Sequence, residues 1–278
     1  MKIKIIRISL VLLLFSILTV LTQVGGVVYL LSLLLHKYVH KWTENRVSRA
    51  AYKCALFLVL YCLATFLVVP GIAKSFGRVT LPMTQKNHLR PLNLITCILN
   101  RHYVKLEMRT IAYEVANQMN EKYPGTCINY LDANFPLFDY FPLFPHLSHD
   151  DGKKLDLSFC YRKSKTNQST NQCPSFIGYG ICEEPLPNEE DMPCSCSKQG
   201  FWQYSLMSKI IPQGNKKKFT FDESKTRSLI GLFVDKPSIE KIFIEPHLKT
   251  RLRLSSNKVR FHGCQAVRHD DHIHVQIK

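Results

Sequence analysis

Two short runs of histidine and acidic residues, far apart in the chain, have the composition of a metal site. The first, HLSHDDGKKLD, covers residues 146–156, and the second, HDDHIH, covers residues 269–274. Two neutral imidazoles and one carboxylate, with a fourth position open to water, make a catalytic zinc site rather than a closed structural one. The alternative is a pair of polar segments whose histidines bind nothing.

Strand geometry predicts how these side chains meet. His272 and His274 are two residues apart, so in an extended strand both imidazoles leave the same face, while the apolar residues beside them pack on the other face. Gly152 permits a turn that folds His149 back over a strand that begins near Asp156. The two runs can therefore meet on one face of a sheet.

Each run alone is weak evidence for a metal site, because the chain has 11 histidines and such spacings arise by chance. Together, however, they resemble the LAS group of zinc peptidases, which includes lysostaphin, the D-Ala-D-Ala carboxypeptidases and the zinc domain of hedgehog proteins. Within that group they are most similar to the HxSHxxGxDxD and HxxHxH motifs of the penicillin-insensitive murein endopeptidases. The resemblance covers roughly residues 90–278.

The resemblance implies a role for each histidine in the two runs. It makes His149, Asp156 and His274 the zinc ligands. His269 falls at the position of the general base. His272 falls at the position of a histidine that contacts the bound water or the developing oxyanion.

Three more residues are expected beside the ligands. His146 matches a further active-site histidine of the murein endopeptidases, and Asp271 is placed to orient a ligand imidazole. Lys154 departs from the family pattern, which has Asp or Ala at that position. The lysine either binds a substrate carboxylate, lowers the pKa of the carboxylate ligand, or turns outwards.

The segments around these residues mix helices and strands without regular alternation. Apolar residues from Met108 to Met119 recur at helical spacing, and strand composition marks residues 126–133, 155–160, 241–244 and the end of the chain. This order predicts an α+β fold, with a small antiparallel sheet and flanking helices that carry the zinc site.

The first 75 residues have a different character. Residues 8–35 and 54–73 carry no charge, and each stretch is long enough to cross a bilayer. We therefore expect a two-helix transmembrane hairpin within residues 1–78. A polar tether over residues 75–93 then leads into a zinc peptidase-like domain, residues 79–278, with a Cys-rich insertion at about 163–200.

The formal net charge of +16 is spread along the chain. The sequence lacks a Gly-rich phosphate loop, an RNA-binding aromatic signature and zinc-finger spacing, so nucleic acid is not an expected partner. Basic residues are densest between the two apolar stretches. The positive-inside rule thus favours a cytoplasmic loop, with both ends of the hairpin outside.

Ten cysteines are many for 278 residues, and eight of them follow the second apolar stretch. An even number in a domain outside the cytoplasm favours disulfides over a second metal site, with the connectivity open. The eight are Cys97, Cys127, Cys160, Cys173, Cys182, Cys194, Cys196 and Cys264.

These features together predict a membrane-anchored zinc metallopeptidase. Its expected substrates are peptidoglycan cross-links or stem peptides, and its expected place is the bacterial inner membrane with the catalytic domain on the periplasmic side. One alternative is a D,D-carboxypeptidase or dipeptidase that acts on soluble peptides. Another is a non-catalytic, zinc-stabilised binding module at the membrane.

Overall fold

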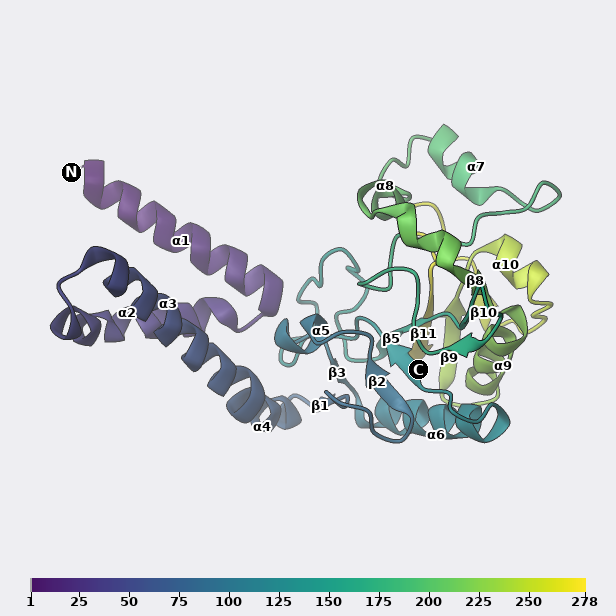
Figure 1. The fold of residues 1–278 in the computed structure, drawn as a ribbon, viewed down its shortest axis with the longest axis horizontal. Helices are drawn as coiled ribbons and strands as arrows, with labels where there is room; N and C mark the ends of the chain where they lie inside the picture. The colour runs from purple at the N-terminus through teal and green to yellow at the C-terminus, as the bar shows by residue number, and fades with distance from the viewer. Residues whose placement is uncertain (1) are drawn as a thin grey trace.

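The computed structural model describes residues 2–278, which form a group of apolar helices and a larger α/β domain, residues 76–278 (Figure 1). The helical part comprises α1 (Lys2–Thr22), α2 (Gly25–Trp42), α3 (Arg46–Leu63), the π-helical turn η1 (Ala64–Val68) and α4 (Val69–Ser75). The last three follow one another without a break and form one long helix. Two helices are long and apolar enough to cross a membrane, Ile5–Thr22 and Arg46–Ser75.

The first uncharged stretch is not a single helix. The expected span over residues 8–35 is wrong, because the chain turns at Gln23, whose φ is 66°, and α2 runs back beside α1 (Figure 1). Gly26 allows the two helices to approach closely, since a Cβ atom there would lie 2.6 Å from the carbonyl oxygen of Phe15. The second expected span, residues 54–73, lies inside the long helix.

The central sheet of the α/β domain has six strands in the order β10–β9–β11–β5–β4–β2. The three inner pairings are antiparallel and the two outer ones are parallel. The sheet is therefore larger than the expected small antiparallel one, because β2 and β10 add in parallel at its edges. The strands are β2 (Leu89–Pro91), β4 (Ile128–Tyr130), β5 (Lys154–Ser158), β9 (Ile239–Phe243), β10 (Val259–Arg260) and β11 (His272–Ile277).

Two smaller sheets accompany it. One pairs β1 (Val79–Thr80) with β3 (Tyr103–Val104), and the other has the order β7–β6–β8. The strands of this three-stranded sheet are β6 (Tyr161–Lys163), β7 (Ser169–Thr170) and β8 (Phe219–Phe221).

Apolar and polar side chains alternate along β5 and β11, so one face of the sheet packs into the core and the other carries the candidate site. Leu155 and Leu157 of β5, with Ile273 and Val275 of β11, are fully buried in one apolar cluster. That cluster also contains buried side chains of α6 (Leu106–Lys122) and α9 (Glu223–Val234), so these helices pack on this face of the sheet. Because side chains alternate, the intervening histidines and Asp156 lie on the opposite face.

The remaining helices are short. They are α5 (Ile95–Ile98), α7 (Met192–Lys198), α8 (Leu206–Ile210), the 3-10 turn η2 (Gln213–Lys218) and α10 (Pro246–Arg251). The helix expected near residues 108–119 is α6.

The expected polar tether over residues 75–93 is wrong, because this segment is built into the fold. β2 forms an edge of the central sheet, and the Arg78 side chain is completely buried. Contacts also join the helices to the domain directly. Tyr61 donates a hydrogen bond to the Ile98 carbonyl (2.7 Å), and the Asn100 amide contacts the hydroxyl of Thr65 (3.3 Å).

The cysteines pair less than expected. A disulfide joins Cys196 to Cys264, and the other six cysteines of the α/β domain are unpaired, as are Cys54 and Cys62. Most of those six are buried, where they pack as small apolar side chains.

Candidate metal centre

The register of two neighbouring strands brings the two histidine-rich runs together. β11 pairs with β5 so that His274 lies opposite Asp156, and His272 opposite Ser158. All four side chains share the face of the sheet away from α6 and α9. The strand-to-strand contact therefore links residues more than a hundred positions apart in the chain.

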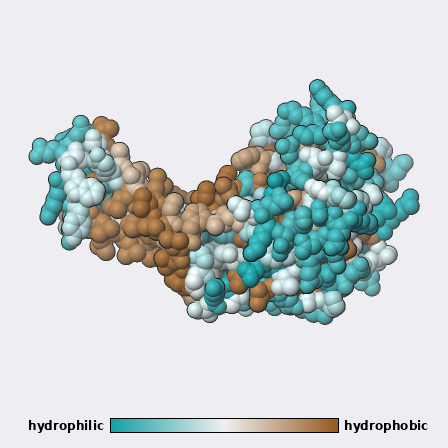
Figure 2. Space-filling view, turned by 60° about the horizontal axis from the view of Figure 1, so that its bottom comes forward, coloured by the Kyte–Doolittle hydropathy of each residue, from teal (hydrophilic) through white to brown (hydrophobic). Residues whose placement is uncertain are grey.

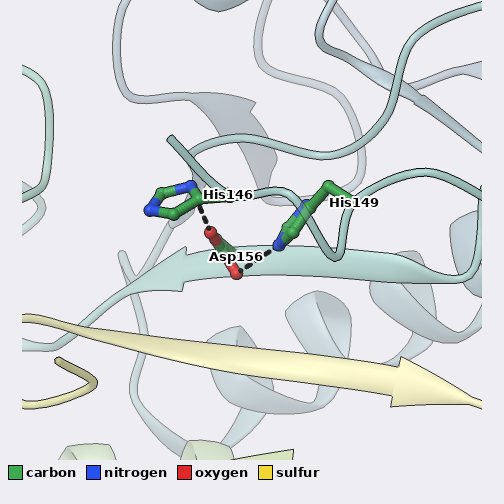
Figure 3. A group of neighbouring side chains, drawn as sticks. All are labelled: His146, His149 and Asp156. Carbon is green, nitrogen blue, oxygen red and sulfur yellow. Dashed lines mark ion pairs between the residues drawn. The ribbon is translucent and has the colours of Figure 1, made fainter. Parts of the chain in front are cut away.

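A loop supplies the remaining histidines. We call residues 135–150, which precede β5, the aromatic loop; it carries His146 and His149 over Asp156 (Figure 3). The buried Arg78 guanidinium holds both ends of this loop, since it donates to the carbonyl of Phe135 and to that of Asp150. Gly152, with φ of 80°, makes the turn into β5.

Three candidate ligand atoms converge at the centre. Nε2 of His149 lies 3.2 Å from Oδ1 of Asp156 and 3.0 Å from Nδ1 of His274, and that nitrogen lies 2.9 Å from the same oxygen. Ligands that bind zinc tetrahedrally at 2.0–2.1 Å lie about 3.3 Å from one another. The spacing of these three atoms is close to that value.

The donor chemistry also suits a cation. Nδ1 of His149 lies 2.6 Å from the Ala133 carbonyl oxygen, which can only accept, so the ring proton is on Nδ1 and the lone pair of Nε2 faces Asp156. A lone pair directed at a carboxylate requires a proton or a cation between them. The ligand-type atoms of His146, His149 and Asp156 also lie within 4.8 Å of one another, and this buried group could bind a metal ion.

A scan against protein-family models finds no match for this chain, and a search of curated proteins finds none either.

The charge states of two of these residues fit a metal site. Burial raises the pKa of the Asp156 carboxyl, but the neighbouring His149 and His272 outweigh it and hold that pKa well below its usual range. Burial lowers the pKa of His274 to about 3. Metal binding needs an ionised carboxylate and a neutral imidazole, and these residues have those forms at neutral pH.

The two residues expected to act in catalysis lie beside the three atoms. Nε2 of His272 is 3.7 Å from Oδ2 of Asp156. The ring of His269 is 4.9 Å from that of His272 and 5.7 Å from that of His274, measured between centroids. Nδ1 of His269 and Nε2 of His272 are buried without a hydrogen-bond partner among the described residues.

The pKa values of these two histidines move in opposite directions. Burial lowers the pKa of His269 well below its ordinary value. Burial also disfavours the charged form of His272, but the carboxylates of Asp156 and Asp271 outweigh it and raise that pKa to about 9.

The three residues expected beside the ligands have separate surroundings. Nδ1 of His146 lies 3.3 Å from Oδ2 of Asp156, and Asp271 accepts a hydrogen bond from Nδ1 of His272. Lys154 shares the face of Asp156, but its ammonium pairs with Asp151 at 2.6 Å. The ammonium thus fastens the turn that enters β5, and the three alternatives for the lysine stay predictions.

Three residues that lie at the site were not identified from the sequence. Tyr179, from the Cys-rich insertion, donates to Oδ2 of Asp156 (2.8 Å). Glu245, between β9 and α10, accepts a hydrogen bond from the backbone N–H of His269 (3.0 Å). His262 stacks on Phe243 with ring centroids 4.1 Å apart, and its ring lies 5.3 Å from that of His269.

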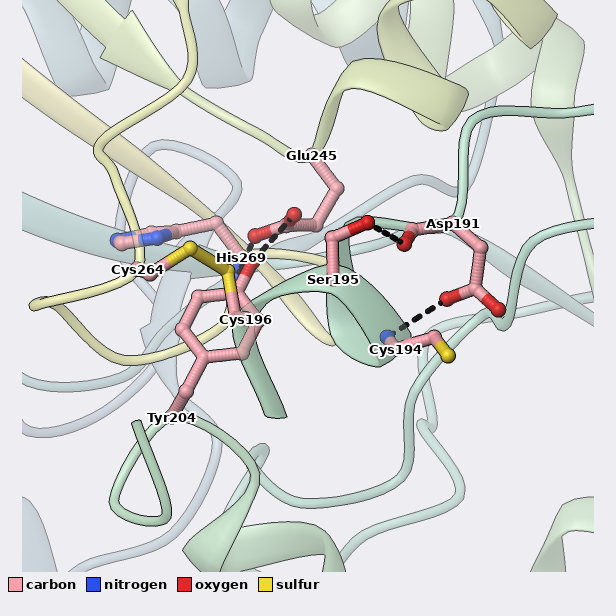
Figure 4. The surroundings of a disulfide bond; sticks show 8 residues. All are labelled: Asp191, Cys194, Ser195, Cys196, Tyr204, Glu245, Cys264 and His269. Atoms are coloured by element: carbon pink, nitrogen blue, oxygen red, sulfur yellow. Dashed lines mark hydrogen bonds between the residues drawn. A yellow bond between two sulfur atoms is a disulfide. The ribbon is translucent and has the colours of Figure 1, made fainter. Parts of the chain in front are cut away.

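The insertion covers the centre. The cavity beside His146 and His272 has a volume of about 10 Å³, and its walls include Tyr179 of the insertion, with Tyr204 and Met207 from the segment that follows it. The disulfide from Cys196 fastens the insertion near His269 (Figure 4). A cavity of this size holds one water molecule and is too small for a peptide.

Proposed function

We propose that this chain is a membrane-anchored zinc metallopeptidase that cleaves peptide bonds in peptidoglycan cross-links or stem peptides. The observation that carries the proposal is the convergence of two ring nitrogens and one carboxylate oxygen within 2.9–3.2 Å, where the aromatic loop meets the central sheet and beside two further histidines. The choice of peptidoglycan rests on the resemblance of the two motifs to the murein endopeptidases.

The residues divide the work of hydrolysis. His149, Asp156 and His274 would hold the ion, and zinc, when bound, supplies a Lewis acid and lowers the pKa of water. His269, whose backbone Glu245 fixes, takes the proton from the attacking water. His272, held at Nδ1 by Asp271, directs Nε2 at the centre and stabilises the oxyanion.

The test measures metal content and digestion of purified murein for the full chain in detergent. We expect one zinc per chain, and His149→Ala to lose both the zinc and the release of murein peptides. His269→Ala should keep the zinc and lose the release. A folded protein without zinc would refute the metal centre, and full activity of His269→Ala would refute the assigned base.

One feature favours a second candidate, a non-catalytic zinc-stabilised module. All the residues of the centre are at most 5 % exposed, and the insertion closes over them. Stoichiometric zinc without turnover on any murein fragment would support this candidate. Trimming of free stem peptides without cleavage of cross-linked dimers would instead indicate a carboxypeptidase or dipeptidase.

We place the α/β domain on the periplasmic side of a bacterial inner membrane. α1 and α2 are antiparallel, so the basic N-terminus and the basic segment between α2 and α3 lie at the same end of the helices (Figure 1). The positive-inside rule assigns that end to the cytoplasm. The N-terminus, expected outside on the basis of one unbroken first span, is therefore inside in this proposal, because the turn at Gln23 returns α2 to the side where α1 begins. A disulfide in the domain at the other end agrees with an oxidising compartment.

A further inference from the structure

The aromatic loop, which carries two histidines of the metal centre, also exposes large apolar side chains. Phe138 is 56 % exposed, Tyr140 86 %, Phe144 63 % and Leu147 56 %. Single exposed apolar residues are ordinary, but several together on one segment mark a contact with an apolar partner. The histidine between the last two, His146, is buried.

This loop adjoins the apolar helices. The N–H of Leu137 donates to Oε1 of Gln23 at the turn between α1 and α2 (2.8 Å), and Phe138 packs edge-on against Phe76 just after α4. The hydrophobic surface of the helices reaches the domain at this side (Figure 2). The exposed residues of the loop thus extend the surface that the helices present to lipid.

A second exposed apolar segment lies beside the same helices. α5 and the residue before it expose Leu94, Ile95 and Ile98, and Tyr61 of α3 bonds to the Ile98 carbonyl. The long helix exposes Leu67, Val68 and Ile72 beyond the level of that bond. The apolar residues of α5 therefore lie level with the apolar part of the long helix, which continues beyond them.

The length of the hairpin explains why these residues are apolar. The uncharged part of α1, from Ile8 to Thr22, has fifteen residues and spans about 22 Å at 1.5 Å per residue. The hydrocarbon core of a bilayer is about 30 Å thick. Ile5–Thr22 crosses a membrane only with Arg7 inside the apolar core. With Arg7 at the far surface, the hairpin, which meets the domain at Gln23, leaves about 8 Å of the core at the domain's own surface.

We propose that the aromatic loop and α5 lie in the leaflet on the domain's side of the membrane, and that the metal centre accepts a peptide carried by a lipid in that leaflet. The occupant of the apolar surface is the bilayer. The substrate class rests on the proposed peptidase function, whereas the contact with lipid does not. The enzyme then acts on lipid-linked peptide in preference to soluble peptide.

The lipid contact is tested by tryptophan fluorescence in nanodiscs that contain brominated phosphatidylcholine. The full chain carries Trp42→Phe, Trp202→Phe and Tyr140→Trp, which leaves one tryptophan in the aromatic loop. The matched control carries only Trp42→Phe and reports from Trp202, which is 69 % exposed between α7 and α8. We expect at least twofold quenching at position 140 and little at 202. Equal or no quenching at 140 overturns the lipid contact.

The substrate class is tested with one stem peptide, free or attached to a lipid in the same nanodiscs. The variant Tyr140→Ser, Phe144→Ser should lower the ratio of kcat/KM for lipid-linked over free peptide at least tenfold. The control Leu186→Ser, Ile210→Ser replaces two exposed apolar residues outside the aromatic loop and α5 and should keep that ratio. Equal cleavage of both peptides by the unaltered chain overturns the lipid-linked substrate and leaves the peptidase standing. If the unaltered chain cleaves neither peptide, the proposed peptidase function is refuted. The quenching experiment then still tests the lipid contact independently.

Discussion

Asp156 is the residue on which the contacts of the metal centre converge, and Tyr179 reaches it from the insertion. The tyrosine hydroxyl donates to Oδ2 of Asp156 and accepts from the N–H of Asp132 (3.0 Å), so it fixes the orientation of the carboxylate. Groups that orient a ligand in this way commonly contribute to metal affinity.

Replacing Tyr179 by Phe should therefore weaken zinc binding by about 10–100-fold, because the carboxylate loses its donor and rotates more freely. Competition with a chromophoric chelator measures the dissociation constant. Tyr113→Phe, on α6 away from the centre, is the matched control and should leave it unchanged. Unaltered zinc affinity in Tyr179→Phe would show that the hydroxyl does not support the ligand.

Glu245 introduces a pH dependence of stability. Burial, reinforced by Asp270, raises the pKa of this carboxyl from 4.5 to about 7. The raised pKa means that the protonated form favours folding: this contribution is complete below pH 4.5 and is lost as the pH rises through about 7. At one pKa unit per about 1.4 kcal/mol, the loss is about 3 kcal/mol at most.

Glu245→Gln stays neutral, so its stability relative to the unaltered chain should increase between pH 5 and pH 8. Melting temperatures of both proteins at several pH values measure this difference. A difference in melting temperature that stays constant between pH 5 and pH 8 would mean that Glu245 does not titrate in that range.

The sequence predicted the meeting of the two histidine-rich runs because β11 and β5 alternate with period two, and alternation alone assigns His272, His274 and Asp156 to one face. The roles given to these residues stay predictions. Tyr179 was missed because the insertion has no periodicity. Its signal was the pair of glycines around it: Gly178 and Gly180 both have positive φ, and a Cβ at Gly178 would lie 2.3 Å from the Leu131 side chain.

At the scale of elements, the insertion is held by the single disulfide of the described structure. Cys196 and Cys264 are separated by 68 residues in the chain. A cross-link that closes a loop of this length removes entropy from the unfolded chain and typically stabilises by roughly 2–4 kcal/mol.

Cys196→Ser with Cys264→Ser should thus lower the free energy of unfolding by roughly 2–4 kcal/mol, as measured by urea unfolding followed through Trp202 fluorescence. Cys194→Ser is the matched control, because Cys194 is exposed and unpaired in the same helix. An equal effect of both variants would argue against the Cys196–Cys264 pairing.

The break between α1 and α2 was not predicted because mean hydropathy over residues 8–35 hides a turn made of uncharged residues. Thr22 and Gln23 followed by Gly25 and Gly26 were the local signal. The edge strands β2 and β10 were missed for another reason. They are three and two residues long, too short for a period to be recognised, and their pairing depends on neighbours far along the chain.

For the whole molecule, the hairpin makes a clear prediction about topology. Epitope tags at the N-terminus and between α2 and α3 should lie on the same side of the membrane, and a tag after Lys278 should lie on the other. In spheroplasts, external protease should remove only the last tag. Removal of the N-terminal tag alone would contradict the antiparallel arrangement of α1 and α2, and removal of the first two with protection of the third would reverse the orientation.

The bonds of Tyr61, Thr65 and Gln23 to the α/β domain fasten it to the helices at several points. A domain on a flexible linker samples many heights above a membrane, but this one has a single height. The fold therefore fixes the distance between the candidate metal centre and the membrane surface. A peptidase of the proposed kind, anchored in this way, would diffuse in two dimensions and cleave only bonds within that thin layer, whatever their abundance farther from the surface.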